Sequence, residues 1–376
     1  MRPSSSPSDL FGAVLARGEV AAQVSADAWL RALLDAETAL ARAEATVGLV
    51  PAAAAAAIEA AGSTVDASAI AAGAAAHGNP VLPLVEALRA AMPPDLADSV
   101  HKGATSQDIV DTAAMLVTRR ALDPLLIDLS AAGDAAVALA RRYRDTPMAG
   151  RTLLQQAVPI TFGLTAAGWL AALGAARQRL VAARAGLAVQ LGGAAGTLDG
   201  LSLDLVTRYA AELDLAAPDL PWHTDRTRIA DLAGALGTAA GVIGKVARDI
   251  TLLAQTEVGE VAEAAPGASS AMPHKRNPVA AVSAVACAAQ APGLVATLLA
   301  AMVQEHQRAA GAWHAEWRPL RELLTSVGSA AAWLRQSLSG LTVDEGALAA
   351  NLASMSGGTG LAGALVDRAL ANWEAS

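Results

Sequence analysis

Apolar residues recur along most of this chain at the spacing of amphipathic helices, and short polar segments separate the helical stretches. The first clear helix is predicted from Ser25, a plausible N-cap, to Ala45, with Glu37 interrupting its apolar face. From residue 107 onward the pattern predicts longer helices of roughly 30 residues or more, well above the globular mean. These are expected near 107–145, 160–195, 225–263 and 279–312.

Long helices joined by short turns predict an all-α protein with an elongated central long-helix bundle. The composition agrees, because 54% of residues are hydrophobic and only 3% are aromatic. Alanine and leucine supply most of the apolar content, and both are strong helix formers. We expect a small N-terminal helical domain over 1–104, the central bundle over 105–340, and a short C-terminal helical remnant over 341–376.

The charge balance and the cysteine and histidine content exclude several classes of function. The net charge is −8 and the pI about 5.3, and no basic patch interrupted by aromatic residues occurs, so nucleic-acid binding is not expected. The single cysteine, Cys287, excludes a disulfide within one chain. The histidines lack metal-ligand spacing, so we predict no metal and no other cofactor. The N-terminus has no apolar signal-peptide core, which predicts a cytoplasmic protein.

One stretch, residues 277–304, carries no charge and is long enough to span a bilayer. Pro292 and Gly293 in its middle, the polar Ser283 and Gln290, and the lack of a second such span argue against a membrane role. A central helix buried on all sides within an oligomeric bundle explains the composition better. We therefore expect no membrane association.

The strongest chemical signal is a loop over residues 266–278, where prolines and a glycine exclude regular helix. It contains Ser269 and Ser270 followed by a His-Lys-Arg cluster. Asn277 and Pro278 are expected to be the N-cap and first residue of the next helix, whose free N–H groups would point back at the loop. Cationic side chains and a helix N-terminus together predict an anion site beside a serine that can be activated. A plain surface loop is the alternative.

Two further clusters are rich in hydrogen-bond donors. The first, at 101–108, is either an ordinary helix-capping motif or a binding site for a carboxylate made of hydroxyls and backbone N–H groups. The second, at 150–159, is either a solvated helix entry or a set of donors suited to a planar carboxylate. The donors are His101, Thr105 and Ser106 in the first cluster, and Arg151, Thr152 and Gln155 in the second.

These two clusters and the loop at 269–278 resemble, in this order, the three signature regions of the fumarase/aspartase superfamily. The resemblance covers nearly the whole chain to about residue 330. Within that superfamily the chain is most similar to the 3-carboxy-cis,cis-muconate cycloisomerases. Adenylosuccinate lyases resemble the loop equally well but the other stretches less well. The stretches that favour the cycloisomerases are 221–224, 255–261, 304–308 and 311–317.

The resemblance implies ring closure of a small polycarboxylate, a step of aromatic degradation, without a cofactor. Ser269 would transfer the proton and Lys275 would stabilise its alkoxide. The resemblance also implies a homotetramer with a shared helical core and with sites built from several subunits. The residues implied to hold substrate carboxylates are His101, Thr105, Ser106, Arg151, Thr152, Gln155, Ser270, Asn277 and Arg308.

The chain also departs from the superfamily pattern. Leu153 stands where adenylosuccinate lyases carry a catalytic histidine, and leucine cannot transfer a proton. A carboxylate that adds across a double bond needs no acid for a leaving amine, so Leu153 favours the cycloisomerase. Ala268 replaces the glycine usual before the serines, and the C-terminal domain is short. The alternatives are an adenylosuccinate-lyase-like enzyme that releases fumarate by β-elimination and a non-catalytic helical scaffold, which the retained Ser269 and Lys275 disfavour.

Overall fold

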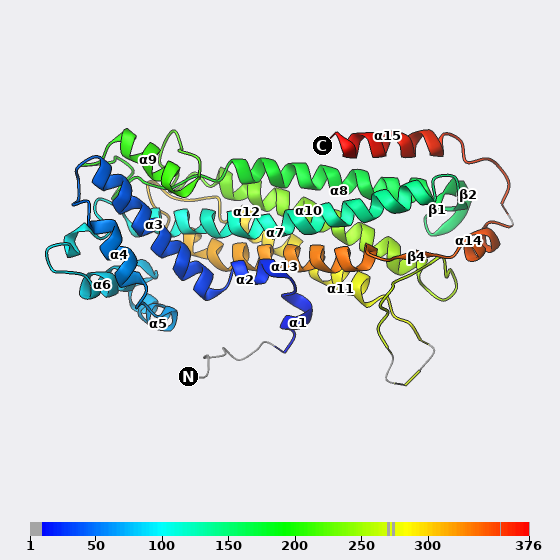
Figure 1. Cartoon of the computed structure of the whole chain (residues 1–376), viewed down its shortest axis with the longest axis horizontal. Coiled ribbons are helices and arrows are strands. Elements are labelled where there is room, and N and C mark those ends of the chain that lie inside the picture. Colours follow the sequence, from blue (N-terminus) through cyan, green and yellow to red (C-terminus); the bar gives the residue numbers. More distant parts are fainter. Residues whose placement is uncertain (1–9, 269–270, 273–274, 354, 376) are drawn as a thin grey trace.

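The computed structural model describes residues 10–268, 271–272, 275–353 and 355–375. The molecule is elongated, with long helices running side by side along its length (Figure 1). Two short two-stranded sheets are present in the described part of the chain. They pair β1 (Pro147–Thr152) with β2 (Gln155–Thr161), and β3 (Val261–Ala262) with β4 (Thr342–Val343). The predicted all-α class with an elongated long-helix bundle is confirmed.

The central bundle is formed by helices that contact one another along their lengths. Its core contains many alanines alongside leucines and a few aromatic residues, and the small side chains allow the helices to pack closely. Phe162 stacks edge-to-face with both Tyr143 and Trp169. The helices are α7 (Ser106–Arg142), α8 (Phe162–Ala185), α10 (Thr227–Leu253), α11 (Val279–Ala288), α12 (Ala291–Ala300) and α13 (Ala312–Leu338).

The longest of these helices, α7, has 37 residues and begins with a capping box. Thr105 is its N-cap, and the backbone N–H of Thr105 donates to Asp108 Oδ2 at 3.0 Å. The backbone N–H of Asp108 donates in return to the carbonyl oxygen of Thr105 at 2.9 Å. The capping interpretation of the first cluster is thus confirmed, and it fixes where α7 begins.

Shorter helices gather at one end of the bundle, at the left of Figure 1. The predicted first helix is α3, which starts after Ser25, whose Oγ accepts from the N–H of Ala28 at 3.2 Å. Helix α9 (Leu203–Leu213) packs on α3 (Ala26–Thr46). The remaining elements of this end and its connection are α1 (Gly12–Leu15), α2 (Glu19–Gln23), α3 (Ala26–Thr46), α4 (Ala54–Gly62), α5 (Ala67–His77), α6 (Val81–Ala91) and the 3₁₀ helix η1 (Ala97–Ser99).

The expected helix over 279–312 is wrong in its extent. It divides into α11 and α12 just before Pro292, which lies at the start of α12. A proline is tolerated there because the first turn of a helix lacks intrahelical N–H partners. Residues 303–311 are not helical, and α13 then begins at Ala312.

The second cluster lies on a β-hairpin, so the expected helix entry there is wrong. Strand β1 (Pro147–Thr152) pairs antiparallel with β2 (Gln155–Thr161), and Thr152 is the register partner of Gln155. The two-residue turn is Leu153-Leu154, with φ of 52° and 64°. Two consecutive positive φ values are those of a type I′ hairpin turn, which usually takes Asn and Gly.

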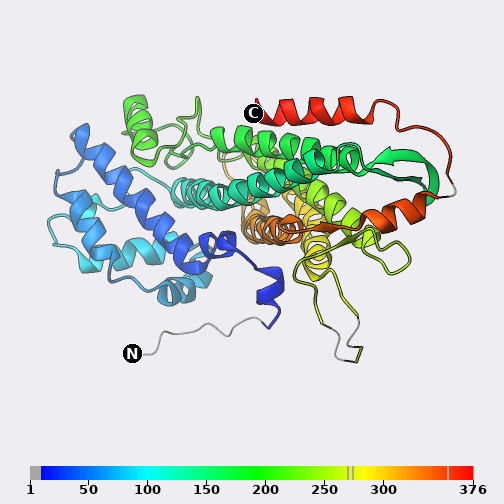
Figure 2. The ribbon, with the colours of Figure 1, turned by 45° about the vertical axis from the view of Figure 1, so that its right-hand side comes forward.

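The C-terminal segment follows the far end of the bundle and then turns back along it (Figures 1 and 2). Strand β4 (Thr342–Val343) pairs with β3 (Val261–Ala262), and α14 (Glu345–Leu352) lies against β1. Helix α15 (Ala362–Glu374) packs on α8. The Trp373 ring lies over Gly133, where an added Cβ would come within 2.2 Å of it.

Two stretches, α10 and residues 279–300, are long and apolar enough to cross a membrane by length and composition alone, so the expected lack of a second such span is wrong. Within this single chain, 50% of the most apolar window of α10 and 39% of that of 279–300 is buried. Val282 and Leu299 in the second stretch are 52% and 46% exposed. One chain therefore does not bury this segment on all sides.

Candidate functional site

The first cluster and Arg308 lie together where α7 begins. Ser106 is the first residue of α7 and is half-buried beside the N-cap Thr105. The Arg308 guanidinium donates to Gln107 Oε1 at 3.1 Å and to the carbonyl oxygen of Ala194 at 2.8 Å. These two bonds hold the guanidinium beside the start of α7, next to the residues that follow Thr105 and Ser106.

A buried carboxylate organises the loop beneath this region. Asp108 Oδ2 accepts from the backbone N–H of Thr105 at 3.0 Å and from that of Gly193 at 2.9 Å. Asp108 Oδ1 lies 2.7 Å from His223 Nε2, and both side chains are almost fully buried. The carboxylate thus holds the 193 loop and His223 against the start of α7.

His101 is the third predicted donor of this end, and it pairs with an acid from α3. Its Nδ1 lies 2.7 Å from Glu37 Oε1, and Glu37 is 1% exposed. Burial of the ring opposes its positive form, but the Glu37 carboxylate outweighs burial and raises the pKa of His101. The polar residue that interrupts the apolar face of α3 is therefore the partner of His101.

One turn further into α7, a buried ion cluster joins three helices. Arg226 donates to Asp111 Oδ2 at 2.8 Å and to Glu316 Oε2 at 2.6 Å, and all three side chains are 1–3% exposed. Trp313 Nε1 also donates to Asp111 Oδ1 at 3.0 Å. The cluster ties α7, α10 and α13 together directly behind the first cluster of donors.

The second cluster lies beyond the opposite end of α7. Arg151 makes a two-pronged ion pair with Glu260, with Nη2 to Oε1 at 2.7 Å and Nη1 to Oε2 at 2.9 Å. Thr152 and Gln155 flank the turn and are exposed. Leu153 at the tip is 97% exposed, so it offers solvent a hydrocarbon surface and no proton.

The loop over residues 266–278, from here on the third cluster, is closed at its base by backbone hydrogen bonds between Gly267 and Asn277, of 2.8 and 3.1 Å. A Cβ on Gly267 would lie 2.1 Å from Val279 Cγ2, so this position has no room for a side chain. Lys275 is exposed. Ser269 and Ser270 lie outside the described residues. The flanking segments run away from the bundle near α11 (Figures 1 and 2).

The helix N-terminus after this loop is not free, and the expectation that it forms an anion site is wrong. Asn277 pairs with Gly267 instead of capping the helix, which begins at Val279. The N–H groups of Ala280 and Ala281 donate to the Glu263 carboxylate at 3.1 and 2.8 Å. A carboxylate of the same chain thus already occupies the place predicted for an external anion.

Among the described residues of one chain, the three clusters do not come together. His101, Thr105, Ser106 and Arg308 gather at one end of α7, whereas Arg151, Thr152 and Gln155 lie beyond its other end (Figure 1). The base of the third-cluster loop lies in the same half of the molecule as the hairpin. No single chain therefore assembles all the predicted donors around one substrate.

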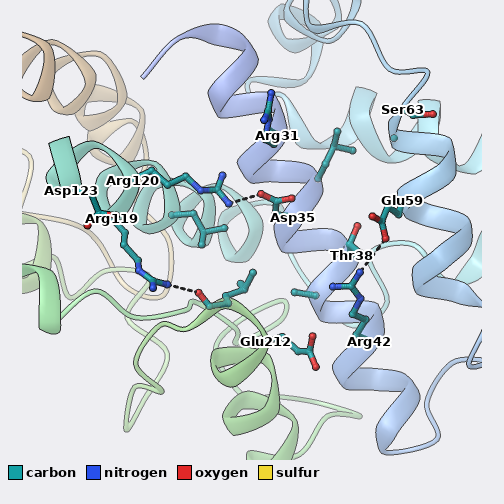
Figure 3. Close-up of a pocket in the computed structure, with 15 residues that line it drawn as sticks. Arg31, Asp35, Thr38, Arg42, Glu59, Ser63, Arg119, Arg120, Asp123 and Glu212 are labelled. Atoms are coloured by element: carbon teal, nitrogen blue, oxygen red, sulfur yellow. Dashed lines mark hydrogen bonds and ion pairs between the residues drawn. The ribbon is translucent and has the colours of Figure 1, made fainter. Parts of the chain in front are cut away.

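A separate pocket of about 640 Å³ opens between α3, α4, α7 and α9 and is lined by charged residues of both signs (Figure 3). Arg120 pairs with Asp35 at 2.6 Å, and Arg42 with Glu59 at 3.0 Å. None of the predicted substrate donors that the structure describes lines it. Because most of its charges are already paired, we assign it no part in the chemistry.

Sequence reasoning missed the acids that hold the donors in place. Glu37, Glu260 and Glu263 are all buried and bind His101, Arg151 and the start of α11. Glu37 could have been identified from the sequence, because it is a charged residue on the otherwise apolar face of its helix. Glu263 acts on N–H groups 17 and 18 residues away, and no local pattern in the sequence shows such a contact.

Comparison with known proteins gives consistent matches. A model of a lyase family matches residues 10–293. A 3-carboxy-cis,cis-muconate cycloisomerase of Bradyrhizobium diazoefficiens is 48% identical over 93% of this chain and 80% of its own. A nitrosuccinate lyase of Streptomyces davaonensis is 50% identical over 92% of this chain and 77% of its own. The crystal structure of the 3-carboxy-cis,cis-muconate lactonizing enzyme from Pseudomonas putida has a TM-score of 0.87 and 40% identity, covering 97% of this chain and 88% of that one.

Proposed function

The chain belongs to the lyase family whose model matches residues 10–293, within the fumarase/aspartase superfamily, and from this we propose that it is a cycloisomerase that closes 3-carboxy-cis,cis-muconate to a carboxymuconolactone. The observation that carries the proposal is similarity along nearly the whole chain to cycloisomerases, at 48% identity in sequence and a TM-score of 0.87 in structure. The alternative of a non-catalytic scaffold is not supported by these relatives.

In the proposed reaction a substrate carboxylate oxygen attacks a carbon of the conjugated diene and forms the lactone C–O bond. The displaced π electrons move onto the adjacent carbon and into its carboxylate, which gives a dianionic enediolate. Ser269 then donates its hydroxyl proton to that carbon, and solvent reprotonates the serine alkoxide. The net change is addition of the carboxylate and a proton across one double bond.

In this mechanism Lys275 contributes more to stabilising the serine alkoxide than the sequence alone suggested. Because Glu263 caps α11, the helix N-terminus has no free N–H groups at Ala280 and Ala281 to stabilise the alkoxide. The Lys275 ammonium is then the group that lowers the pKa of the Ser269 hydroxyl and stabilises the enediolate.

The remaining predicted donors hold the three carboxylates of the substrate. At the first cluster, Thr105, Ser106 and the fixed Arg308 guanidinium offer hydroxyls and a cation. Although burial opposes its charge, Glu37 raises the pKa of His101, so the ring keeps both N–H groups to a higher pH than usual; with Nδ1 on Glu37, Nε2 is left to donate to a substrate carboxylate. The second and third clusters supply Thr152, Gln155, Ser270 and Asn277, whereas Arg151, predicted as a donor from the sequence, is paired with Glu260.

We propose that the active form is a homotetramer in the cytoplasm with sites shared between subunits. The bundle leaves an uncharged face exposed, with Val282 52% and Val303 83% accessible. Burying such a face against other copies is favourable, at roughly 25 cal/mol per Å² of apolar surface. The exposed Leu153 at the hairpin tip also suits contact with another chain.

A second candidate is supported by the nitrosuccinate lyase relative. Elimination of nitrite from a nitro-substituted succinate would release a weakly basic anion that needs no acid. Leu153 is as compatible with that reaction as with lactone formation. Elimination of an amine, as expected of an adenylosuccinate-lyase-like enzyme, fits less well, because Leu153 cannot protonate it.

The deciding experiment incubates the purified protein with 3-carboxy-cis,cis-muconate and follows loss of the diene absorbance. A parallel assay offers nitrosuccinate and follows fumarate and nitrite. We expect the first reaction, and we expect Ser269→Ala to abolish it while circular dichroism stays unchanged. Ser68→Ala, on the exposed face of α5, is the matched control. Full activity of Ser269→Ala would contradict the mechanism, and fumarate formation without lactone would favour the second candidate.

A further inference from the structure

Arg151 is held by its own chain in a way that suggests a different role from binding substrate. Both Nη atoms of Arg151 donate to the carboxylate of Glu260, whose side chain has no exposed surface. Such two-pronged pairs are strong and fix geometry as well as charge. An arginine whose charge is already matched this way is a poor receptor for a further carboxylate, but it is a good anchor for the end of β1.

Glu260 has a second ligand from the C-terminal segment. Asn351, in the last turn of α14, donates from Nδ2 to Glu260 Oε1 at 2.9 Å and to the carbonyl oxygen of Val258 at 2.8 Å. Glu260 therefore accepts from Arg151 and Asn351 together, and removal of either donor leaves a buried carboxylate with fewer partners. The amide of Asn351 is placed to orient the carboxylate that orients Arg151.

Asn351 also reaches the other strand of the hairpin. Its carbonyl oxygen accepts from Gln156 Nε2 at 2.8 Å. Arg151 and Gln156 are register partners, and the next pair toward the turn is Thr152 with Gln155. The contacts from α14 thus hold Arg151 and Gln156 in place. This pair directly adjoins the predicted substrate donors Thr152 and Gln155.

We propose that Arg151, Glu260 and Asn351 form a clamp that positions Thr152 and Gln155 for the reaction proposed above, on which this inference rests. Arg151 is then a positioning residue, and so is Asn351. The C-terminal segment contributes this positioning contact through α14.

The test compares steady-state kinetics of Asn351→Ala, Arg151→Lys, Arg151→Ala and the double variant R151A/N351A. Glu345→Gln, exposed in the first turn of the same helix, is the matched control. We expect Asn351→Ala to raise KM about tenfold with kcat changed less, because a hydrogen bond to a charged group is lost and the substrate donors lose their fixed position. Arg151→Lys should raise KM similarly, because lysine keeps the positive charge but cannot make the two-pronged pair of the guanidinium.

The effects of substitutions at residues that act through the same contacts do not add. The double variant should therefore lie within about twofold of Arg151→Ala in kcat/KM. Hydrogen–deuterium exchange of amides 150–156 should accelerate in Asn351→Ala and stay unchanged in Glu345→Gln. Exchange needs no substrate, so it reports on the clamp even if the wild-type protein does not turn over 3-carboxy-cis,cis-muconate. Absence of turnover in the wild-type protein would contradict the proposed function but not the clamp.

Three outcomes would overturn the clamp. One is unchanged KM and unchanged exchange in Asn351→Ala. Another is losses in the two single variants that multiply in the double variant. The third is a lower yield of folded tetramer, by size-exclusion chromatography, with normal kinetics per folded chain. If Arg151→Ala fails to fold, the comparison of Arg151→Lys with Asn351→Ala and their double variant gives the same decision.

Discussion

Thr105 caps the start of α7, and Thr152 lies on the hairpin just beyond its end. A helix of 37 residues is about 55 Å long at 1.5 Å per residue. One small substrate cannot touch both threonines of the same chain. If both contact substrate, each active site has to combine the α7 start of one subunit with the hairpin of another.

This separation predicts complementation between two defective variants. Ser106→Ala removes a donor from the first cluster and Thr152→Val one from the second, and each should lose roughly 10- to 100-fold in kcat/KM. Coexpressed with different affinity tags and purified as mixed tetramers, they should recover about a quarter of the wild-type rate, because random assembly leaves that share of sites intact. Separately purified variants, mixed without exchange of subunits, are the control. Recovery no better than the average of the two variants would show that one chain supplies both donors.

The buried Glu44 predicts that stability falls as pH rises. Burial, with the neighbouring Glu37 carboxylate, raises the pKa of Glu44 to about 8. In the unfolded chain it ionises near 4.5, so its charge favours unfolding increasingly between about pH 4.5 and 8. Both carboxylate oxygens lack a hydrogen-bond partner among the residues that the structure describes. Glu44→Gln should therefore stabilise the protein at pH 8, by roughly 1–3 kcal/mol, and not at pH 4.5.

Urea unfolding at pH 4.5, 6 and 8 measures the Glu44 effect. Glu59→Gln, an exposed acid on α4, gives the matched baseline for loss of a carboxylate. A stability difference between Glu44→Gln and wild type that does not change with pH would contradict the assigned pKa.

The Asp111–Arg226–Glu316 cluster predicts a large loss of stability when its centre is removed. Arg226→Ala leaves two buried carboxylates without their cation, which should cost about 3–5 kcal/mol of unfolding free energy. Arg318→Ala breaks an exposed pair with Glu322 one turn apart and should produce no measurable change. Equilibrium urea denaturation checks both variants. Equal effects of the two would mean that burial of the cluster contributes nothing.

The Glu263 cap predicts that an acid far from α11 controls that helix. Glu263→Ala removes the acceptor of two backbone N–H groups and of Ser337 Oγ, which donates to it at 2.6 Å. We expect a loss of roughly 1–3 kcal/mol, measured by thermal or urea unfolding. Asp66→Ala, an exposed cap of α5, should cost less. A loss for Glu263→Ala no greater than that of Asp66→Ala would argue against the cap.

Local patterns predicted the caps and the long helices of this fold but not the contacts between distant segments. Ser25 and Thr105 were identifiable as helix starts because an N-cap acts within three residues. The β-hairpin was missed because its turn is Leu153-Leu154, without the Gly or Asn that signals a type I′ turn. Helix α13 was missed because a polar, motif-like segment precedes it.

The candidate site could be predicted as a set of residues but not as an arrangement. The sequence indicated which side chains donate hydrogen bonds, and the family resemblance grouped them. It did not show that Arg151 faces Glu260 or that Glu263 fills the start of α11, because each contact joins residues 17 to 109 positions apart. Such pairings depend on the packed bundle rather than on neighbouring residues.

The Leu153-Leu154 turn has a consequence for how the protein reaches its working state. Non-glycine residues at positive φ cost of order 1–3 kcal/mol each, and these two also present apolar side chains to water. In the proposed homotetramer, a newly made subunit would expose this strained, apolar turn until a neighbouring subunit covers it. Slow or dilute assembly would then leave the turn free to contact other apolar surfaces, so we expect the yield of folded protein to rise with the rate of subunit assembly.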